Sequence, residues 1–140
     1  LQNIIVKSSW LVFTLSLLMW LFFMIFGKFF LSIFGEEFVQ GFNSLIILSS
    51  GLLICTISAS AGLLLMMTGF EKNAALIIGI TAVFNIVLNL LLIPAYSING
   101  AAIATSISTV TMNIALMFTS WHKIQINPTI FGIFKKRRMA

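Results

Sequence analysis

The sequence predicts an all-α integral membrane protein of about four antiparallel transmembrane helices, from its composition and from the lengths of its uncharged runs. Hydrophobic residues make up 60% of the chain and charged residues only 8%, whereas charged residues make up about a quarter of a soluble domain. Uncharged runs lie at about 8–27, 42–66, 74–93 and 100–121. Each is long enough to cross a hydrocarbon core of about 30 Å as an α-helix. Open strands would leave backbone groups unpaired in lipid.

The first run lies between Lys7 and Lys28. Its Leu, Phe, Met and Trp side chains suit contact with lipid. The run is longer than the roughly 7 to 15 residues of a signal-peptide core, so we do not expect it to be cleaved. Because the chain begins with Leu1 rather than Met, we expect a fragment whose N-terminal part is missing.

The second run carries small residues that suit close packing. Ser50, Ser58 and Gly62 lie near one stripe with a spacing of four, beside Ala59 and Ala61. Small residues let membrane helices approach one another closely. We therefore expect this helix to pack inward.

The last two runs carry polar stripes with helical spacing. Side chains four residues apart lie above one another on a helix, and the stripes are Thr81, Asn85 and Asn89, and then Thr105, Thr109 and Asn113. An amide that faces acyl chains is costly, so each stripe is expected to meet another helix or a watery cavity. We predict that these six residues line a polar path. The alternative is that they only hydrogen-bond to neighbouring helices.

Short connections make neighbouring helices antiparallel. The sequence predicts loops at 28–40 and 94–99 on one side of the membrane and a turn at 68–73 on the other. Pro94 has no backbone N–H and disfavours a helical residue before it, so we expect it to end the third helix.

Positive charge predicts the orientation. If the terminal cluster Lys135 to Arg138 is cytoplasmic, four spans place Lys7 and Lys72 on the same side, and only Lys28 of the eight Lys and Arg residues lies outside. The positive-inside rule therefore favours a multi-pass protein of the cytoplasmic membrane with both termini in the cytoplasm.

Residues 1–121 then form the four-helix transmembrane region, and residues 122–140 form a basic cytoplasmic tail. Membrane lipid is the expected partner of the transmembrane region. The tail either lies on the anionic inner leaflet or extends into solvent. Its basic residues are not interleaved with aromatic residues on a polar surface, so nucleic acid is not an expected partner.

No catalytic, cofactor or metal site is predicted, and we do not expect an enzyme. His122 is the only histidine, and Cys55 is the only cysteine. Glu36 and Glu37 belong either to a solvated loop or, together with Lys28, to the mouth of a cavity that meets a charged substrate.

The stretch from Asn85 to Thr105 reads NIVLNLLLIPAYSINGAAIAT. It resembles the N-x-x-L-N-x-x-L-I-P-x-x-G-x-x-G-A-A-x-A-T pattern of polysaccharide-export flippases and their multidrug-exporter relatives. The I-F-G-E-E-F sequence from Ile33 to Phe38 and the G-x-x-K turn from Gly69 to Lys72 fit as well. Ser97 departs from the pattern, because the family more often has glycine there.

The resemblance implies that these helices are the last part of a two-lobe transporter with about twelve to fourteen helices. It implies that the transporter flips an isoprenoid-linked oligosaccharide across the cytoplasmic membrane for O-antigen, capsule or other polysaccharide export. In that setting the polar stripes would hydrogen-bond the sugars, and Lys28 would attract the diphosphate. Polysaccharide polymerase and glycosyltransferases are further implied partners. Four helices cannot form the whole cavity, so we expect this chain alone not to transport.

Two other functions stay open at this point. A cation-coupled multidrug exporter of the same superfamily would favour an acidic residue within a helix, and none of the four runs contains one. A small non-transporting accessory subunit of the membrane is the second alternative, and it would require the chain to be complete.

Overall fold

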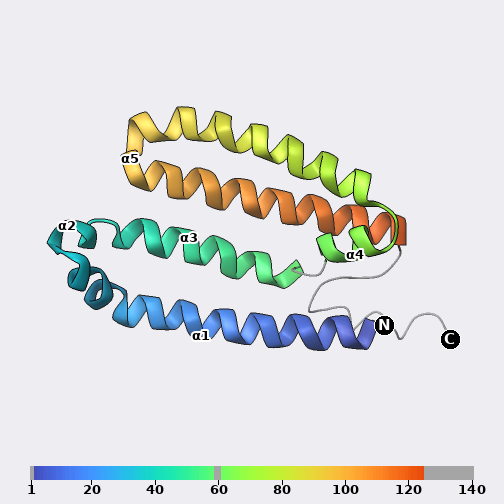
Figure 1. Cartoon of the computed structure of the whole chain (residues 1–140), viewed down its shortest axis with the longest axis horizontal. Coiled ribbons are helices and arrows are strands. Elements are labelled where there is room, and N and C mark those ends of the chain that lie inside the picture. Colours follow the sequence, from blue (N-terminus) through green and yellow to red (C-terminus); the bar gives the residue numbers. More distant parts are fainter. Residues whose placement is uncertain (1, 59–60, 125–140) are drawn as a thin grey trace.

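The computed structural model describes residues 2–58 and 61–124, and all the elements within them are helices (Figure 1). In chain order they are α1 (Gln2–Phe34), α2 (Glu36–Val39), α3 (Phe42–Cys55), the short 3-10 helix η1 (Thr56–Ser58), α4 (Ala61–Met67) and α5 (Glu71–Ile124). This confirms the predicted all-α class for the described residues. Ala59 and most of the predicted basic tail lie outside them.

The first helix is longer than predicted, because α1 continues through Lys28 to Phe34 instead of ending at residue 27. Lysine is a good helix former, and its ammonium here lies 5.2 Å from the centre of the Phe42 ring. The helix ends before Gly35, whose φ of 130° is open to glycine without steric cost. Much of the predicted loop at 28–40 is therefore helical.

The second predicted run is not one straight helix. The segment Phe42–Ser58 is bent by 47° from Ala61–Met67. The α-helix ends at Cys55, and the chain tightens into η1, where Thr56 Oγ1 donates to the Leu53 carbonyl at 2.6 Å. Such a 3-10 segment within a helical run changes the axis of the helix.

The predicted turn after this run is present but short. Gly69 has a φ of 83°, and the Phe70 N–H donates to the Leu65 carbonyl at 2.9 Å. This bond and the left-handed glycine are the features of a Schellman cap, which satisfies the last carbonyls of a helix. Because α5 begins at Glu71, the turn ends three residues earlier than predicted.

The third and fourth predicted runs lie in α5, which folds back on itself (Figure 1). The reversal is at Ser97, with φ 50° and ψ −129°, so Pro94 lies inside the helical segment and does not end it. Gly100 makes the reversal possible, because a Cβ at this position would collide with the Leu92 carbonyl. We call the parts before and after Ser97 the first and second arms of α5.

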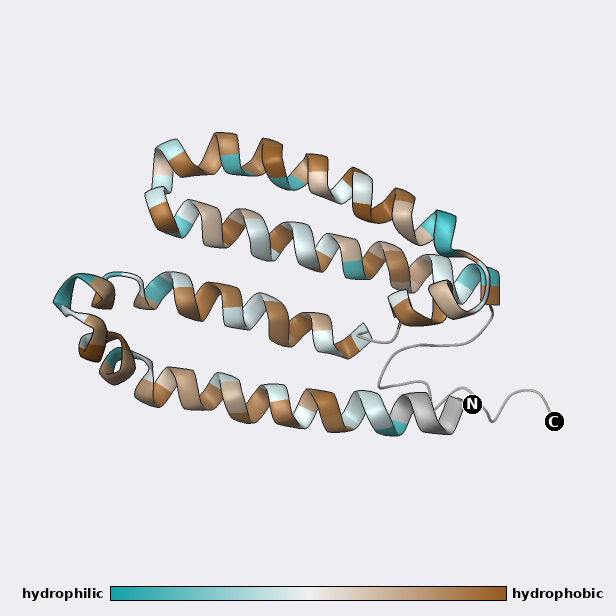
Figure 2. Ribbon diagram, viewed as in Figure 1, coloured by the Kyte–Doolittle hydropathy of each residue, from teal (hydrophilic) through white to brown (hydrophobic). Residues whose placement is uncertain are grey.

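Many exposed side chains are large and apolar, on helices that are mostly hydrophobic (Figure 2), and the buried residues are mostly small, some apolar and some polar. The exposed residues include Ile25, Phe34, Met67 and Leu90, each with at least 70% of its surface open. The buried residues include Ala61, Ala104, Ser108 and Ser120. Large apolar surfaces of this kind need lipid or a partner, and small buried residues are typical of helix contacts in membranes.

Among the described residues, two helical segments are long and apolar enough to cross a membrane, Lys7–Phe34 and Glu71–Ile124, or up to three if the bent pair Phe42–Ser58 and Ala61–Met67 counts as one span. These lengths and the exposed apolar surface define a membrane-embedded protein.

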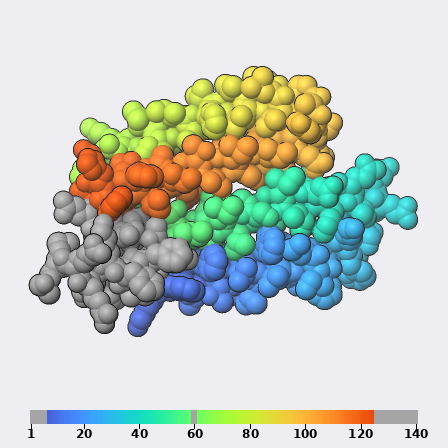
Figure 3. All heavy atoms as spheres, turned by 180° about the vertical axis from the view of Figure 1, so that it is seen from behind, coloured from blue at the N-terminus to red at the C-terminus, as the bar shows by residue number. Residues whose placement is uncertain are grey.

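The helices are stacked in rows, with α3 in contact with both α1 and α5 (Figure 3). Trp20 of α1 donates its Nε1–H to Ser50 Oγ of α3 at 2.9 Å. The apolar core lies where α4 meets both ends of α5, and it consists of Ala61, Leu65, Ala74 and Leu116. The N-terminal end of α1 and the two ends of α5 lie at one end of the molecule, and α2 and the turn of α5 lie at the other (Figure 1).

Candidate functional site

The first arm of α5 has a single covered face, and the predicted polar stripe lies on it. The residues of this arm that are buried or half-buried are Ala74, Ile77, Thr81, Asn85, Leu88, Asn89 and Leu92. Their spacing is that of one helix face. Thr81, Asn85 and Asn89 therefore face the protein, whereas aliphatic residues on the other faces of the arm, such as Ile86 and Leu90, are exposed.

The polar groups on this face are bonded within their own helix. Thr81 Oγ1 donates to the Ile77 carbonyl at 2.8 Å. Asn89 Nδ2 donates to both the carbonyl and the side-chain oxygen of Asn85, at 2.9 and 3.0 Å. The two amides thus form one polar unit at the middle of the arm.

The stripe of the second arm is more open. Thr105 is exposed, whereas Thr109 and Asn113 are half-buried. Thr109 Oγ1 donates to the Thr105 carbonyl at 2.7 Å, and Asn113 Nδ2 donates to the Thr109 carbonyl at 3.0 Å. No hydrogen bond within the described part of the chain joins this stripe to the stripe of the first arm, so the structure does not bring the six residues into one network.

A different polar face of the second arm packs against α3. A seven-residue spacing links Asn99, Ser106, Asn113 and Ser120 on this arm, where Asn113 also belongs to the four-residue stripe, and links Ser44, Gly51 and Ser58 on the α3 side. Ser44 lies opposite Asn99, and Gly51 lies opposite Ser106. Ser44 Oγ donates to Asn99 Oδ1 at 2.7 Å, and Ser106 Oγ donates to the Ile47 carbonyl at 3.1 Å. We call this contact the α3–α5 seam.

The two helices of the seam run parallel, because residue numbers rise together along it. A seven-residue repeat keeps one face of each helix against the other over several turns. Four-residue spacing alone does not reveal this seam. The seven-residue spacing of Asn99, Ser106 and Asn113 is the sequence pattern that indicates it.

The small residues predicted to pack inward are buried or half-buried where the structure describes them, at Ser50, Ser58, Ala61 and Gly62. Ser58 is buried, with 6% of its surface exposed. Ser50 accepts the hydrogen bond from Trp20, and a Cβ on Gly62 would lie 3.4 Å from Leu116 Cδ1. These residues bring α1, α3 and α4 close to their neighbours.

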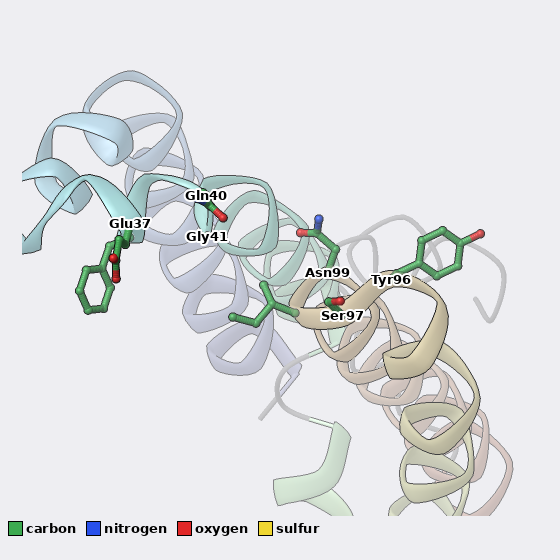
Figure 4. Close-up of a pocket in the computed structure, with 8 residues that line it drawn as sticks. Glu37, Gln40, Gly41, Tyr96, Ser97 and Asn99 are labelled. Atoms are coloured by element: carbon green, nitrogen blue, oxygen red, sulfur yellow. The ribbon is translucent and has the colours of Figure 1, made fainter.

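A pocket of about 550 Å³ opens at the end of the seam, between α2 and the turn of α5 (Figure 4). Its lining consists of Glu37, Phe38, Gln40, Gly41, Tyr96, Ser97, Ile98 and Asn99. Asn99 and Ser97 come from α5, and Gln40 comes from the connection between α2 and α3. Tyr96 extends away from the other labelled residues (Figure 4).

Only one of the three residues predicted for a cavity mouth lines this pocket. Glu37 lines the pocket. Lys28 instead lies over the Phe42 ring, and Glu36 is exposed on α2 outside the pocket lining. Local sequence does not indicate that Gln40, Ser97 and Asn99 share a pocket, because only the reversal of α5 brings residues near 97 next to α2.

The remaining reactive groups form no cluster in the described part of the chain. Three or more His, Cys, Asp or Glu side chains do not come together there as a metal site. Cys55 has no disulfide partner, and the Asn113 side chain is its hydrogen-bonding neighbour. His122, Glu71 and Lys72 are exposed at the ends of α5.

Comparisons of this chain with protein-family models, curated proteins and solved structures find no match. The fold and the site therefore define its class by themselves. In its described residues it is an all-helical, membrane-embedded protein with a polar stripe on the covered face of the first arm and a pocket at one end.

Proposed function

We propose that this chain is a membrane-embedded part of a flippase that moves isoprenoid-linked oligosaccharide across the cytoplasmic membrane for polysaccharide export. The observation that carries the proposal is the covered polar face of the first arm, where Asn85 and Asn89 lie half-buried amid exposed aliphatic residues. Uncharged amides within a membrane suit the hydroxyl groups of a sugar, since each amide both donates and accepts hydrogen bonds. The resemblance of residues 85–105 to the flippase pattern supports the same function.

In this proposal α1, the α3–α4 pair and the two arms of α5 cross the membrane four times, and both termini are cytoplasmic. The charges of the described residues agree with that orientation. Lys7 belongs to the N-terminal part of α1, and Lys72 and Lys123 belong to the two ends of α5, which lie at one end of the molecule (Figure 1). Lys28 belongs to the C-terminal part of α1, and Glu36 and Glu37 belong to α2, at the other end. The sugars would cross along the inward polar faces while the isoprenoid tail stays in the bilayer.

The test replaces the amides in the protein as it is expressed in its own cells. Asn85→Ala combined with Asn89→Ala is expected to lower surface polysaccharide several-fold and to raise the cellular level of lipid-linked oligosaccharide. The matched control is Val87→Ala, because Val87 lies on the same arm but is exposed. Export that is unchanged both in the double variant and in a deletion of the gene would overturn the proposal.

A second candidate is a small accessory subunit of the membrane that does not transport. It is favoured by the bonds of Thr81, Thr109 and Asn113, whose side chains donate to carbonyls within their own helices. Such groups need no substrate to satisfy them. If this function holds, deletion of the chain will lower the membrane level of a partner protein that co-purifies with it, and the Asn85→Ala, Asn89→Ala variant will not.

A further inference from the structure

We propose that the pocket between α2 and the turn of α5 binds an uncharged saccharide ring. This inference rests on the proposed function for its orientation in the membrane, where the pocket faces outward and would hold sugar after it has crossed. The choice of ligand class rests on the pocket itself.

The polar groups of the pocket match hydroxyl groups. The side-chain amides of Gln40 and Asn99 can both donate and accept hydrogen bonds. The Ser97 hydroxyl can also donate and accept, and the Glu37 carboxylate can accept. A sugar ring presents hydroxyl groups that donate and accept in every direction. The lining therefore offers complementary groups from two separate parts of the chain.

The Asn99 amide is held in place for this role. Its Oδ1 accepts a hydrogen bond from Ser44 at 2.7 Å, while its Nδ2 makes no hydrogen bond to any described residue. The contact with Ser44 fixes the orientation of the amide, so the NH₂ group stays available as a donor. A donor that is already oriented loses less conformational entropy on binding.

The other lining residues select against anions and add apolar surface. No Lys, Arg or His belongs to the lining, and Glu37 is its only charged residue, so phosphate or a carboxylate ligand would meet repulsion. Phe38 provides aromatic surface for the C–H faces of a sugar, whereas the Tyr96 ring extends away from the other labelled residues at the edge of the pocket (Figure 4). The volume of about 550 Å³ lies within the usual range for small-molecule sites, roughly 300–1,000 Å³.

The chain contains a natural reporter for this pocket, because Tyr96 is its only tyrosine. The full chain, labelled with 3-fluorotyrosine and purified in lipid nanodiscs, will give one ¹⁹F resonance that belongs to the pocket. Titration with uncharged N,N′-diacetylchitobiose is expected to shift this resonance saturably. Pyrophosphate at equal concentration is expected to leave it unchanged.

Two amide variants test the lining. Gln40→Ala is expected to raise the saccharide dissociation constant about tenfold, as expected for one lost hydrogen bond in a small site. Asn43→Ala is the matched control, because Asn43 is an exposed amide on the next turn that does not line the pocket. Circular dichroism checks that both variants keep their helix content. The inference would be overturned if the two variants changed the saccharide dissociation constant equally. It would also be overturned if saccharide did not shift the ¹⁹F resonance, or if only pyrophosphate shifted it.

This experiment is independent of the test of transport. If the saccharide shift depends on Gln40 but export is unchanged in the deletion strain, the pocket binds saccharide and the protein is not a flippase. If export is lost in the Asn85→Ala, Asn89→Ala variant but saccharide causes no shift, the flippase proposal is supported and the saccharide-binding proposal is wrong.

Discussion

Gly51 of α3 faces Ser106 of α5 so closely that a hydrogen atom is the only side chain that fits at position 51. A Cβ at this position would lie 2.7 Å from both Cβ and Oγ of Ser106. The close approach also allows Ser106 Oγ to reach the Ile47 carbonyl at 3.1 Å. The α3–α5 seam therefore depends on one glycine in its middle.

We predict that Gly51→Ala destabilises the protein by about 1–3 kcal/mol, because the added methyl group overpacks the seam. The measurement is unfolding in detergent micelles followed by circular dichroism. Gly79→Ala is the control, because a Cβ there meets nothing within 4 Å, and removing a helical glycine is expected to add about 0.5–1 kcal/mol of stability. Equal stabilities of the two variants would contradict the tight contact.

Gly100→Ala is expected to be more damaging than Gly69→Ala, although Gly69 is the glycine with positive φ. At position 100 the new Cβ would collide with the Leu92 carbonyl, and the turn of α5 would have to open. Overpacking against backbone is expected to cost about 3 kcal/mol. At position 69 a Cβ meets nothing within 4 Å, so only the left-handed backbone is strained, at about 1–2 kcal/mol. The same unfolding measurement ranks the two variants, and the reverse order would argue against the described turn.

Ser44 and Asn99 are expected to be energetically coupled across the seam. A double-mutant cycle with Ser44→Ala and Asn99→Ala should give a coupling energy of about 0.5–1.5 kcal/mol, the usual range for an interhelical hydrogen bond in a membrane protein. Ser49→Ala replaces Ser44→Ala in the control cycle, because Ser49 Oγ donates only to the Leu45 and Ile46 carbonyls of its own helix. The control cycle should be additive, and similar coupling in both cycles would disprove a specific Ser44–Asn99 contact.

The proposed orientation predicts which end of the molecule is accessible from outside the cell. In a Cys55→Ala background, Glu36→Cys should react with a membrane-impermeant maleimide in intact cells. Glu71→Cys should react only after the cells are permeabilised, because the proposal places it in the cytoplasm. Both side chains are exposed, so a difference in labelling reports the side of the membrane. If Glu71→Cys but not Glu36→Cys is labelled in intact cells, the orientation is the opposite of the one proposed.

The polar stripe of the first arm was predictable, whereas its counterpart on the second arm was only partly so. Thr81, Asn85 and Asn89 all lie on the covered face, because a stripe of polar groups in an apolar helix has a strong preference for the interior. The second arm is covered on more than one side, and its half-buried polar residues include both Thr109 and Ser106. Four-residue spacing alone could not choose between its polar faces.

The errors at helix boundaries have a local cause. Lys28 and Pro94 were both expected to end helices, yet α1 passes through Lys28 and α5 passes through Pro94. The observed ends are set by backbone conformation, at Gly35 and Gly69 with positive φ and at the reversal on Ser97. A charge near the end of an apolar run indicates the membrane surface more reliably than it indicates the end of a helix.

The sequence by itself determined the class of the protein, because composition and uncharged length decide whether a chain can remain in water and which backbone structure can remain in lipid. It also determined the inward stripe of the first arm. The tertiary structure alone decided the parallel α3–α5 seam and the pocket, since both join residues more than fifty positions apart, such as Ser44 and Asn99. The spacing of residues along one helix identifies which of its faces turns inward. The helix that this face contacts depends on the reversal at Ser97 and the close packing at Gly51, which place the neighbouring helices.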